Sequence, residues 1–82
     1  MKAIIIEDEK TTSQYLRSII EKEYPEVEVL AEIDSVESGL KWFEANEDPE
    51  LIFSDVRLTD GLSFDIFDKV KPVSAIVFIT AY

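Results

Sequence analysis

Four short apolar runs, separated by longer amphipathic stretches, constrain the fold of this chain more than any other feature. They are residues 3–6, 27–33, 51–53 and 75–79. The first, third and fourth runs are wholly apolar, and a short run of this kind is typical of a strand covered on both faces of a sheet. The second alternates apolar and mostly polar residues, which is typical of an exposed or edge strand. We therefore expect four β-strands.

The stretches between these runs have helical character. Residues 10–23 carry apolar side chains at helical spacing, and Thr11 with Gln14 matches a capping box. Pro25 follows closely and ends this helix. The first connection between strands is therefore expected to be a helix of about four turns.

Two further helices are expected later in the chain. Ser35 is suited to cap the second, which should end near Asn46. Asp60 and Gly61 form a turn that leads into a third, short helix, and Pro72 closes it. The order βαβαβαβ predicts an α/β fold, a doubly wound parallel sheet with helices on both faces, in one domain over residues 1–82.

Composition excludes several classes of function. With 8 Lys+Arg against 18 Asp+Glu the net charge is −10, which opposes binding to nucleic acid or to anionic membrane surfaces by this segment. The chain has no Cys and no His, so a disulfide scaffold, a thiol nucleophile and an ordinary zinc site are excluded. No apolar run approaches the ~20 residues that span a bilayer. We expect a soluble, cytoplasmic protein.

Polar residues stand at or just beyond the ends of three of the predicted strands: Glu7 and Asp8, then Asp55, then Thr80. Taken singly, each acid also fits a helix cap or a turn. In parallel α/β sheets, however, ligands bind beyond the carboxyl ends of the strands, where these residues are expected to meet. Gathered carboxylates repel one another unless a pKa rises or a cation binds. Oxygen ligands favour Mg²⁺ or a similar hard cation.

The motifs at these strand ends resemble the receiver domain of two-component response regulators. They are the segments 5–9, 52–58, 60–61 and 78–81, spaced as in that family. Residues 58–64 and the ending 80–82 resemble the LytTR-type (LytR/AlgR) subset, whose output domain binds DNA. The resemblance covers the whole chain and implies a flavodoxin-like receiver fold.

Roles for individual residues follow from the resemblance. It implies that Asp55 accepts a phosphoryl group from the phosphohistidine of a sensor histidine kinase. Asp8 and Asp55 would bind Mg²⁺ directly, the backbone carbonyl of Arg57 would complete the protein ligands, and Glu7 would act largely through water. Thr80 would supply the switch hydroxyl. The domain would then be a regulator of an output, transcriptional domain rather than an enzyme.

One departure from the family leaves an alternative open. The resemblance implies a lysine on a later strand, and no lysine of this chain occupies that place. We therefore expect a receiver domain that is incomplete at its C-terminus, with the output domain absent, and with an apolar edge at residues 75–79 that favours a homodimer. The alternative is a receiver-like interaction module that is not phosphorylated. An aspartyl-phosphate hydrolase or mutase is disfavoured, because Arg57 stands where its second acid is needed.

Overall fold

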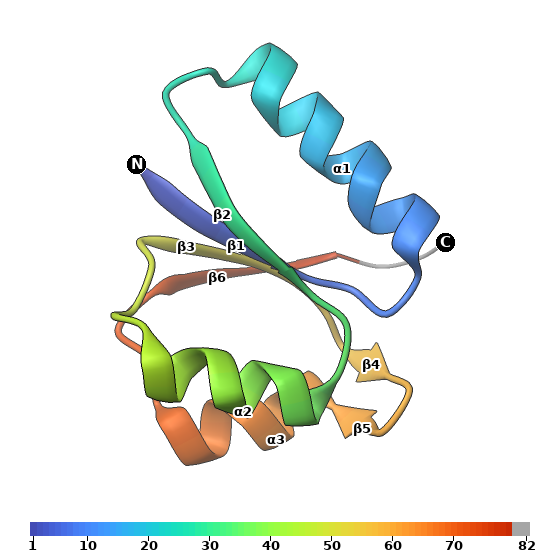
Figure 1. Cartoon of the computed structure of the whole chain (residues 1–82), viewed down its shortest axis with the longest axis vertical. Coiled ribbons are helices and arrows are strands. Elements are labelled where there is room, and N and C mark those ends of the chain that lie inside the picture. The colour runs from blue at the N-terminus through green and yellow to red at the C-terminus, as the bar shows by residue number, and fades with distance from the viewer. Residues whose placement is uncertain (80–82) are drawn as a thin grey trace.

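The chain folds around one parallel β-sheet (Figure 1). The computed structural model describes residues 1–79 of the 82-residue chain. The sheet order is β2-β1-β3-β6, and all three neighbouring pairs are parallel. The strands are β1 (Lys2–Ile6), β2 (Glu28–Ile33), β3 (Leu51–Asp55) and β6 (Ala75–Ile79). The four predicted strands and the α/β, doubly wound class are confirmed.

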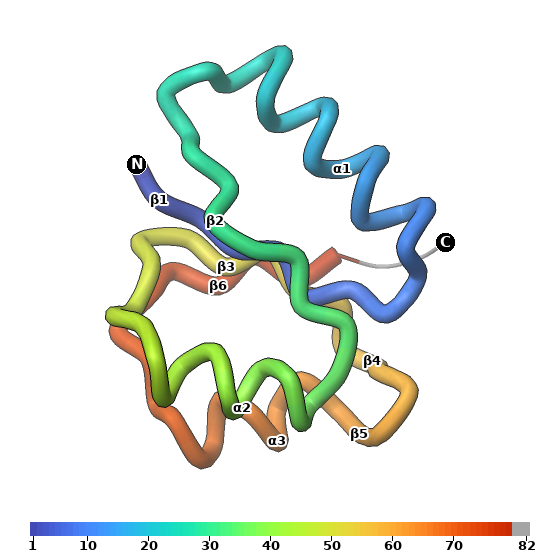
Figure 2. The backbone as a smooth tube through the Cα atoms, in the orientation of Figure 1, coloured from blue at the N-terminus to red at the C-terminus, as the bar shows by residue number. Residues whose placement is uncertain are grey.

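Three helices cover the two faces of the sheet. They are α1 (Lys10–Glu23), α2 (Val36–Ala45) and α3 (Ser63–Val70). Helix α1 lies on one face, whereas α2 and α3 lie together on the other, as the backbone trace also shows (Figures 1 and 2). Helices on both faces bury both sides of the central strands.

The position of β1 between two helical layers explains why residues 3–6 are apolar without alternation. Ile4 and Ile6 belong to the core between the sheet and the α2–α3 layer. Ile5 belongs to the core beneath α1 together with Ile20 and Val29. Since successive side chains of a strand point to opposite faces, the part of a strand that lies between two helical layers is apolar on both faces, as residues 3–6 are here.

Strand β2 lies at one edge of the sheet, as its alternating sequence predicted. Its Glu32 connects the strand to α1. One carboxylate oxygen of Glu32 accepts a hydrogen bond from the hydroxyl of Ser13 at 2.6 Å, and the other accepts one from Arg17 at 2.9 Å. These bonds lower the pKa of Glu32, because both favour its ionised form.

The predicted N-cap is observed for α2 but not for α1. Ser35 caps α2, and its hydroxyl accepts a hydrogen bond from the backbone N–H of Ser38 at 3.0 Å, as expected. The helix spans residues 10–23 as expected, but the capping box assigned to Thr11 and Gln14 is wrong, because the N-cap residue is Glu9, two residues before Thr11, and it makes no side-chain cap. The acidic residues before α1 belong to the site described below. Their tertiary contacts determine where the helix begins, and a local sequence pattern does not reveal such contacts.

A small antiparallel hairpin between β3 and α3 was not predicted. It consists of β4 (Arg57–Leu58) and β5 (Gly61–Leu62), joined by a two-residue turn. Leu58 is buried in the core and anchors the hairpin. Gly61 has a φ of 153°, a backbone conformation that favours glycine. The hairpin lies at the end of the sheet where the candidate site is found (Figure 1).

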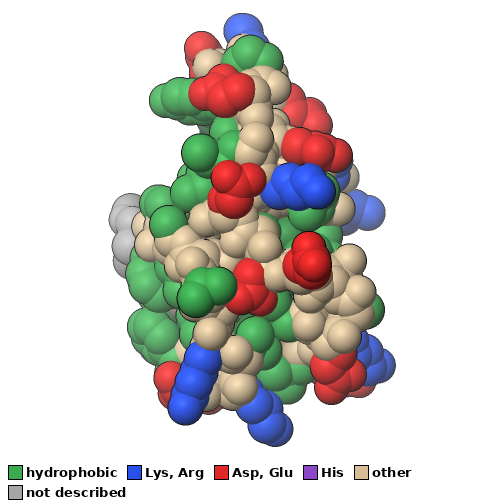
Figure 3. Space-filling model, turned by 90° about the vertical axis from the view of Figure 1, so that its left-hand side faces the viewer, with side chains coloured by type: hydrophobic (Ala, Val, Ile, Leu, Met, Phe, Trp, Pro, Cys, Tyr) green, Lys and Arg blue, Asp and Glu red, His purple; other side chains and the backbone are tan. Residues whose placement is uncertain are grey.

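The surface opposite that end carries charge of both signs. Figure 3 shows the face at the amino ends of the strands, where acidic side chains are scattered over the surface rather than gathered at one point.

Among the helices described for residues 1–79, none has the length and the apolar composition that crossing a membrane requires.

Candidate functional site

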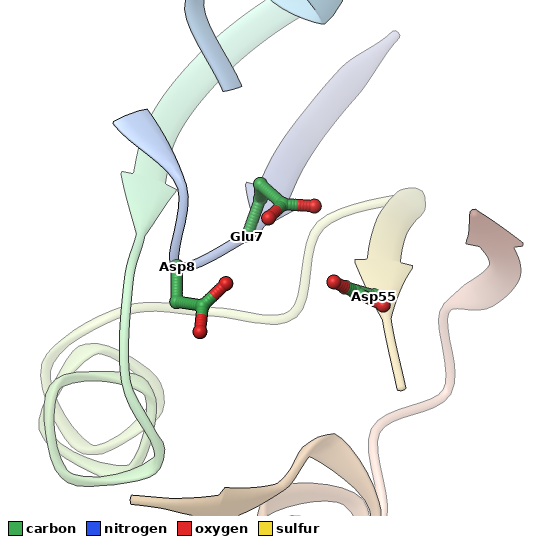
Figure 4. A group of neighbouring side chains, drawn as sticks. All are labelled: Glu7, Asp8 and Asp55. Atoms are coloured by element: carbon green, nitrogen blue, oxygen red, sulfur yellow. The ribbon is translucent and has the colours of Figure 1, made fainter. Parts of the chain in front are cut away.

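Three carboxylates meet at the carboxyl ends of the two central strands. Glu7 and Asp8 directly follow β1, and Asp55 is the last residue of β3. The two strands are neighbours in register, so that Ile6 lies opposite Ser54. One oxygen from each carboxylate lies within 4.8 Å of the other two. Figure 4 shows the three side chains turned toward a common space.

Glu7 is the most buried of the three acids, with only 6% of its surface exposed. Its backbone N–H donates to the carbonyl of Ile33 at 2.8 Å, which fixes the residue between β1 and the end of β2. Its Oε1 accepts a hydrogen bond from the N–H of Glu9 at 3.0 Å. Burial raises the pKa of Glu7, and the negative charge of Asp55 adds to this effect.

Asp55 is half-buried and is held by the backbone that follows it. Its Oδ1 accepts a hydrogen bond from the N–H of Val56 at 2.7 Å. Beneath it, the fully buried Ser54 donates its hydroxyl to the carbonyl of Asp55 at 2.8 Å. Within residues 1–79, no hydrogen bond engages Oδ2 of Asp55. One oxygen of this carboxylate is therefore fixed, and the other remains for an external group.

Asp8 is exposed, and its side chain is held by a residue far away in the sequence. Its Oδ2 accepts a hydrogen bond at 3.2 Å from the hydroxyl of Thr59, which lies in the turn of the β4–β5 hairpin. A role for Thr59 was not predicted from the sequence. No local signal marks it, because its partner is 51 positions away.

The donor set fits a hard divalent cation. All three side chains offer oxygen, which Mg²⁺ prefers. In an octahedral shell with bonds of ~2.1 Å, neighbouring ligand oxygens lie ~3.0 Å apart and opposite ones ~4.2 Å apart. The oxygens here lie within 4.8 Å of one another, so small side-chain rotations would bring them into such a shell. A cation would also offset the mutual repulsion of the three acids.

The predicted site also includes Arg57 and Thr80. Arg57 begins β4, two residues past Asp55, with an exposed side chain. Its backbone carbonyl as a ligand stays a prediction. The role predicted for Thr80 concerns a residue outside those that the structure describes. Its predecessor Ile79 pairs with Asp55 in the sheet, so β6 does end beside the site.

A pocket of about 290 Å³ adjoins the acidic group. Glu7 and Asp8 line one side of it, and Ser13 and Glu32 line another. The pocket lies between the start of α1 and the end of β2, on the side where Asp8 is exposed to solvent.

Comparisons with known proteins show relatives for the whole chain. No family model matches it. It is 35% identical over 85 residues to the sensory transduction protein LytT of Bacillus anthracis, and 34% identical to LytT of Enterococcus faecalis. In each case the match covers 100% of this chain and 34% of the relative. The chain thus spans about a third of the length of the curated relatives that it matches.

Solved structures share the fold over nearly all of the chain. The response regulator PhyR from Brucella abortus superposes with a TM-score of 0.81 at 25% identity, covering 99% of this chain and 33% of PhyR. MaeR, a response regulator bound to beryllium trifluoride, gives 0.81 at 22% identity, covering 100% of this chain and 68% of MaeR. A complex of the CheA3 P1 domain with CheY6 from R. sphaeroides gives 0.79 at 24% identity, covering 99% of this chain and 64% of the matched chain.

Proposed function

We propose that this chain, a receiver domain related to those of two-component response regulators, accepts a phosphoryl group on Asp55. The observation that carries the proposal is the convergence of Glu7, Asp8 and Asp55, whose carboxylate oxygens lie within 4.8 Å at the ends of two neighbouring parallel strands. The relatives named as sensory transduction proteins support it. One of the structural neighbours holds beryllium trifluoride, a small group with the shape of a phosphoryl group.

The reaction is a transfer of the phosphoryl group from nitrogen to oxygen. A carboxylate oxygen of Asp55 forms a bond to phosphorus while the phosphorus–nitrogen bond of a phosphohistidine breaks, and the electron pair of that bond returns to the imidazole nitrogen. The bond from Val56 N–H holds Oδ1 of Asp55, so Oδ2 is the oxygen we assign as the nucleophile. The donor is a sensor histidine kinase, and the complex of CheA3 P1 with CheY6 supports this class of partner.

The remaining site residues have assisting roles in the proposal. Asp8, Asp55 and the carbonyl of Arg57 would hold Mg²⁺ directly, and Glu7 would act largely through water. The ion, when bound, neutralises negative charge on the phosphoryl oxygens. Thr80 donates its hydroxyl to the phosphorylated Asp55 and so senses its state. Residues 1–82 would form the N-terminal part of the receiver domain, which regulates an output domain of the whole protein rather than acting as an enzyme.

Intact-mass spectrometry after incubation with phosphoramidate and Mg²⁺ tests the proposal. The wild-type chain should gain the mass of one phosphoryl group, and EDTA should prevent the gain. Asp55→Asn should abolish it. Asp68→Asn, which alters an exposed acid of α3 away from the site, should leave it unchanged. Label that persists on Asp55→Asn would overturn the assignment, and a wild-type chain that gains no mass would favour a module that is never phosphorylated.

A further inference from the structure

We propose that the turn of the β4–β5 hairpin, Thr59 and Asp60, positions the carboxylate of Asp8 for cation binding. This inference rests on the proposed function, because it concerns the same acidic site. Thr59 and Asp60 are positioning residues: neither belongs to the three carboxylates that would hold the cation. We call these two residues the 59–60 turn.

The 59–60 turn is attached to the N-terminus of α2 by hydrogen bonds. One carboxylate oxygen of Asp60 accepts a hydrogen bond from the N–H of Val36 at 2.7 Å, and the other accepts one from the N–H of Glu37 at 3.1 Å. The partners are 24 and 23 positions away in the sequence. Asp60 thus joins the hairpin to a different helix by both of its oxygens.

Asp60 completes the capping of α2. A helix N-terminus exposes N–H groups that have no partner within the helix, together with a partial positive charge. Ser35 serves the N–H of Ser38, and Asp60 serves those of Val36 and Glu37. The same two bonds lower the pKa of Asp60, so the carboxylate remains charged where the helix end favours a negative group.

The strands of the hairpin are attached separately, to the core of the protein. Leu58 is buried in the main core, and it pairs with Gly61 across the hairpin. The N–H of Ser63 donates to the carbonyl of Val56 at 2.9 Å and closes the base of the hairpin. With the strands held by the core and Asp60 held by α2, Thr59 has little freedom to move.

The fixed position of Thr59 restrains the side chain of Asp8. Its side chain is exposed, and within residues 1–79 the hydroxyl of Thr59 is the one hydrogen-bond donor recorded for it. A carboxylate restrained in one orientation loses less rotational freedom when it binds a cation. Partners of this kind, which orient a ligand without touching the metal, contribute about 10- to 100-fold in metal affinity. Because the Thr59 bond is exposed and 3.2 Å long, we expect the lower end of this range.

The test measures Mg²⁺ affinity without any phosphoryl transfer. The dissociation constant is obtained by titrating Mg²⁺ while following the backbone amide NMR signals of Glu7 to Glu9. Thr59→Val has nearly the shape of threonine but lacks the hydroxyl, and it should weaken Mg²⁺ binding about tenfold. Thr59→Ser retains the hydroxyl and should bind within about twofold of wild type. Both variants should unfold near the wild-type temperature without metal, because the bond is exposed.

Asp60→Ala is the second variant in this test. It should weaken Mg²⁺ binding in the same direction and also lower the metal-free unfolding temperature, because two N–H groups of α2 lose their partner. Wild-type affinity in Thr59→Val, or equal losses in Thr59→Val and Thr59→Ser, would overturn the positioning role while leaving phosphorylation of Asp55 intact. A wild-type chain that binds no Mg²⁺ would overturn the proposed metal site and this inference together.

Discussion

A Cβ atom placed on Gly39 would lie 2.5 Å from Cδ1 of Ile66, closer than two carbon atoms approach in proteins. Gly39 lies in α2 and Ile66 in α3, and Ile66 is fully buried. The absence of a side chain at Gly39 therefore sets how closely the two helices pack beneath the sheet. Since the hairpin that leads into α3 follows Asp55 and carries Asp60 in its turn, this packing also supports the end of the molecule that carries the site.

Gly39→Ala should destabilise the fold in spite of the better helix propensity of alanine. We expect a loss of about 1–2 kcal/mol, because the added methyl group displaces Ile66 in a packed core. Ile66→Val removes Cδ1, the atom at 2.5 Å, and by itself should cost about 1 kcal/mol. The double variant should lose less than the sum of the two. Urea denaturation measures all three, and additive losses would show that the two side chains do not interfere.

Asp55→Ala should be more stable than wild type when no metal is present. Removing one of three neighbouring negative charges relieves repulsion, and we expect a gain of about 1 kcal/mol, or roughly 4–8 °C in the unfolding temperature. Millimolar Mg²⁺ should raise the unfolding temperature of wild type and have much less effect on this variant. Asp68→Ala is the matched control and should change neither quantity. Equal responses in wild type and Asp55→Ala would remove the metal site.

Glu32→Gln should lower stability at neutral pH by about 1 kcal/mol, because the charged partner of Arg17 and Ser13 is lost. The folded state lowers the pKa of Glu32 from its ordinary value of 4.5. The stability it contributes is therefore present above pH 4.5 and is lost as the pH falls through the lower, folded-state pKa. Wild type and variant should converge in that acidic range in thermal scans.

The control for this prediction is Glu21→Gln. Glu21 also pairs with Arg17, but its side chain is 55% exposed, so its loss should change stability by less than about 0.5 kcal/mol. A difference between wild type and Glu32→Gln that does not depend on pH would contradict the ionic part of the interpretation.

Self-association through β6 is the fourth expected outcome. Within the described residues β6 pairs only with β3, and Val77 and Phe78 are 45% and 44% exposed on it. Such an edge pairs readily with another strand. We expect sedimentation of the chain at high micromolar concentration to show dimers or larger species, and Val77→Lys to shift them toward monomer. A wild-type chain that stays monomeric would contradict the homodimer.

The sequence predicted the sheet and its helices because their causes are local. The apolar run of β1 and the alternation of β2 reflect which faces are covered, and Ser35 caps the helix that follows it. The convergence of Glu7, Asp8 and Asp55 was also predictable, since parallel neighbours end at the same edge of a sheet. The roles of Asp55 and Arg57, in contrast, came from a family resemblance and not from the pattern of strands and helices.

What the sequence did not predict depends on contacts between distant residues. Thr59 meets Asp8 across 51 positions, and Asp60 meets Val36 across 24. The hairpin that makes both contacts has strands of only two residues, too short for any periodicity. The capping box at Thr11 failed for the reverse reason: a local pattern was present, but the tertiary structure of the β1–α1 loop prevailed.

The pairing of β1 with β3 bears on how quickly this chain reaches its native state. The N–H of Lys2, at the start of β1, donates to the carboxylate of Glu50, just before β3, across 48 positions. Closing a loop of that size costs entropy before the central strands gain any interaction. Parallel sheets of this kind fold more slowly than helical bundles of similar length. The acidic site requires β1 and β3 side by side, so it is complete only after this long loop has closed.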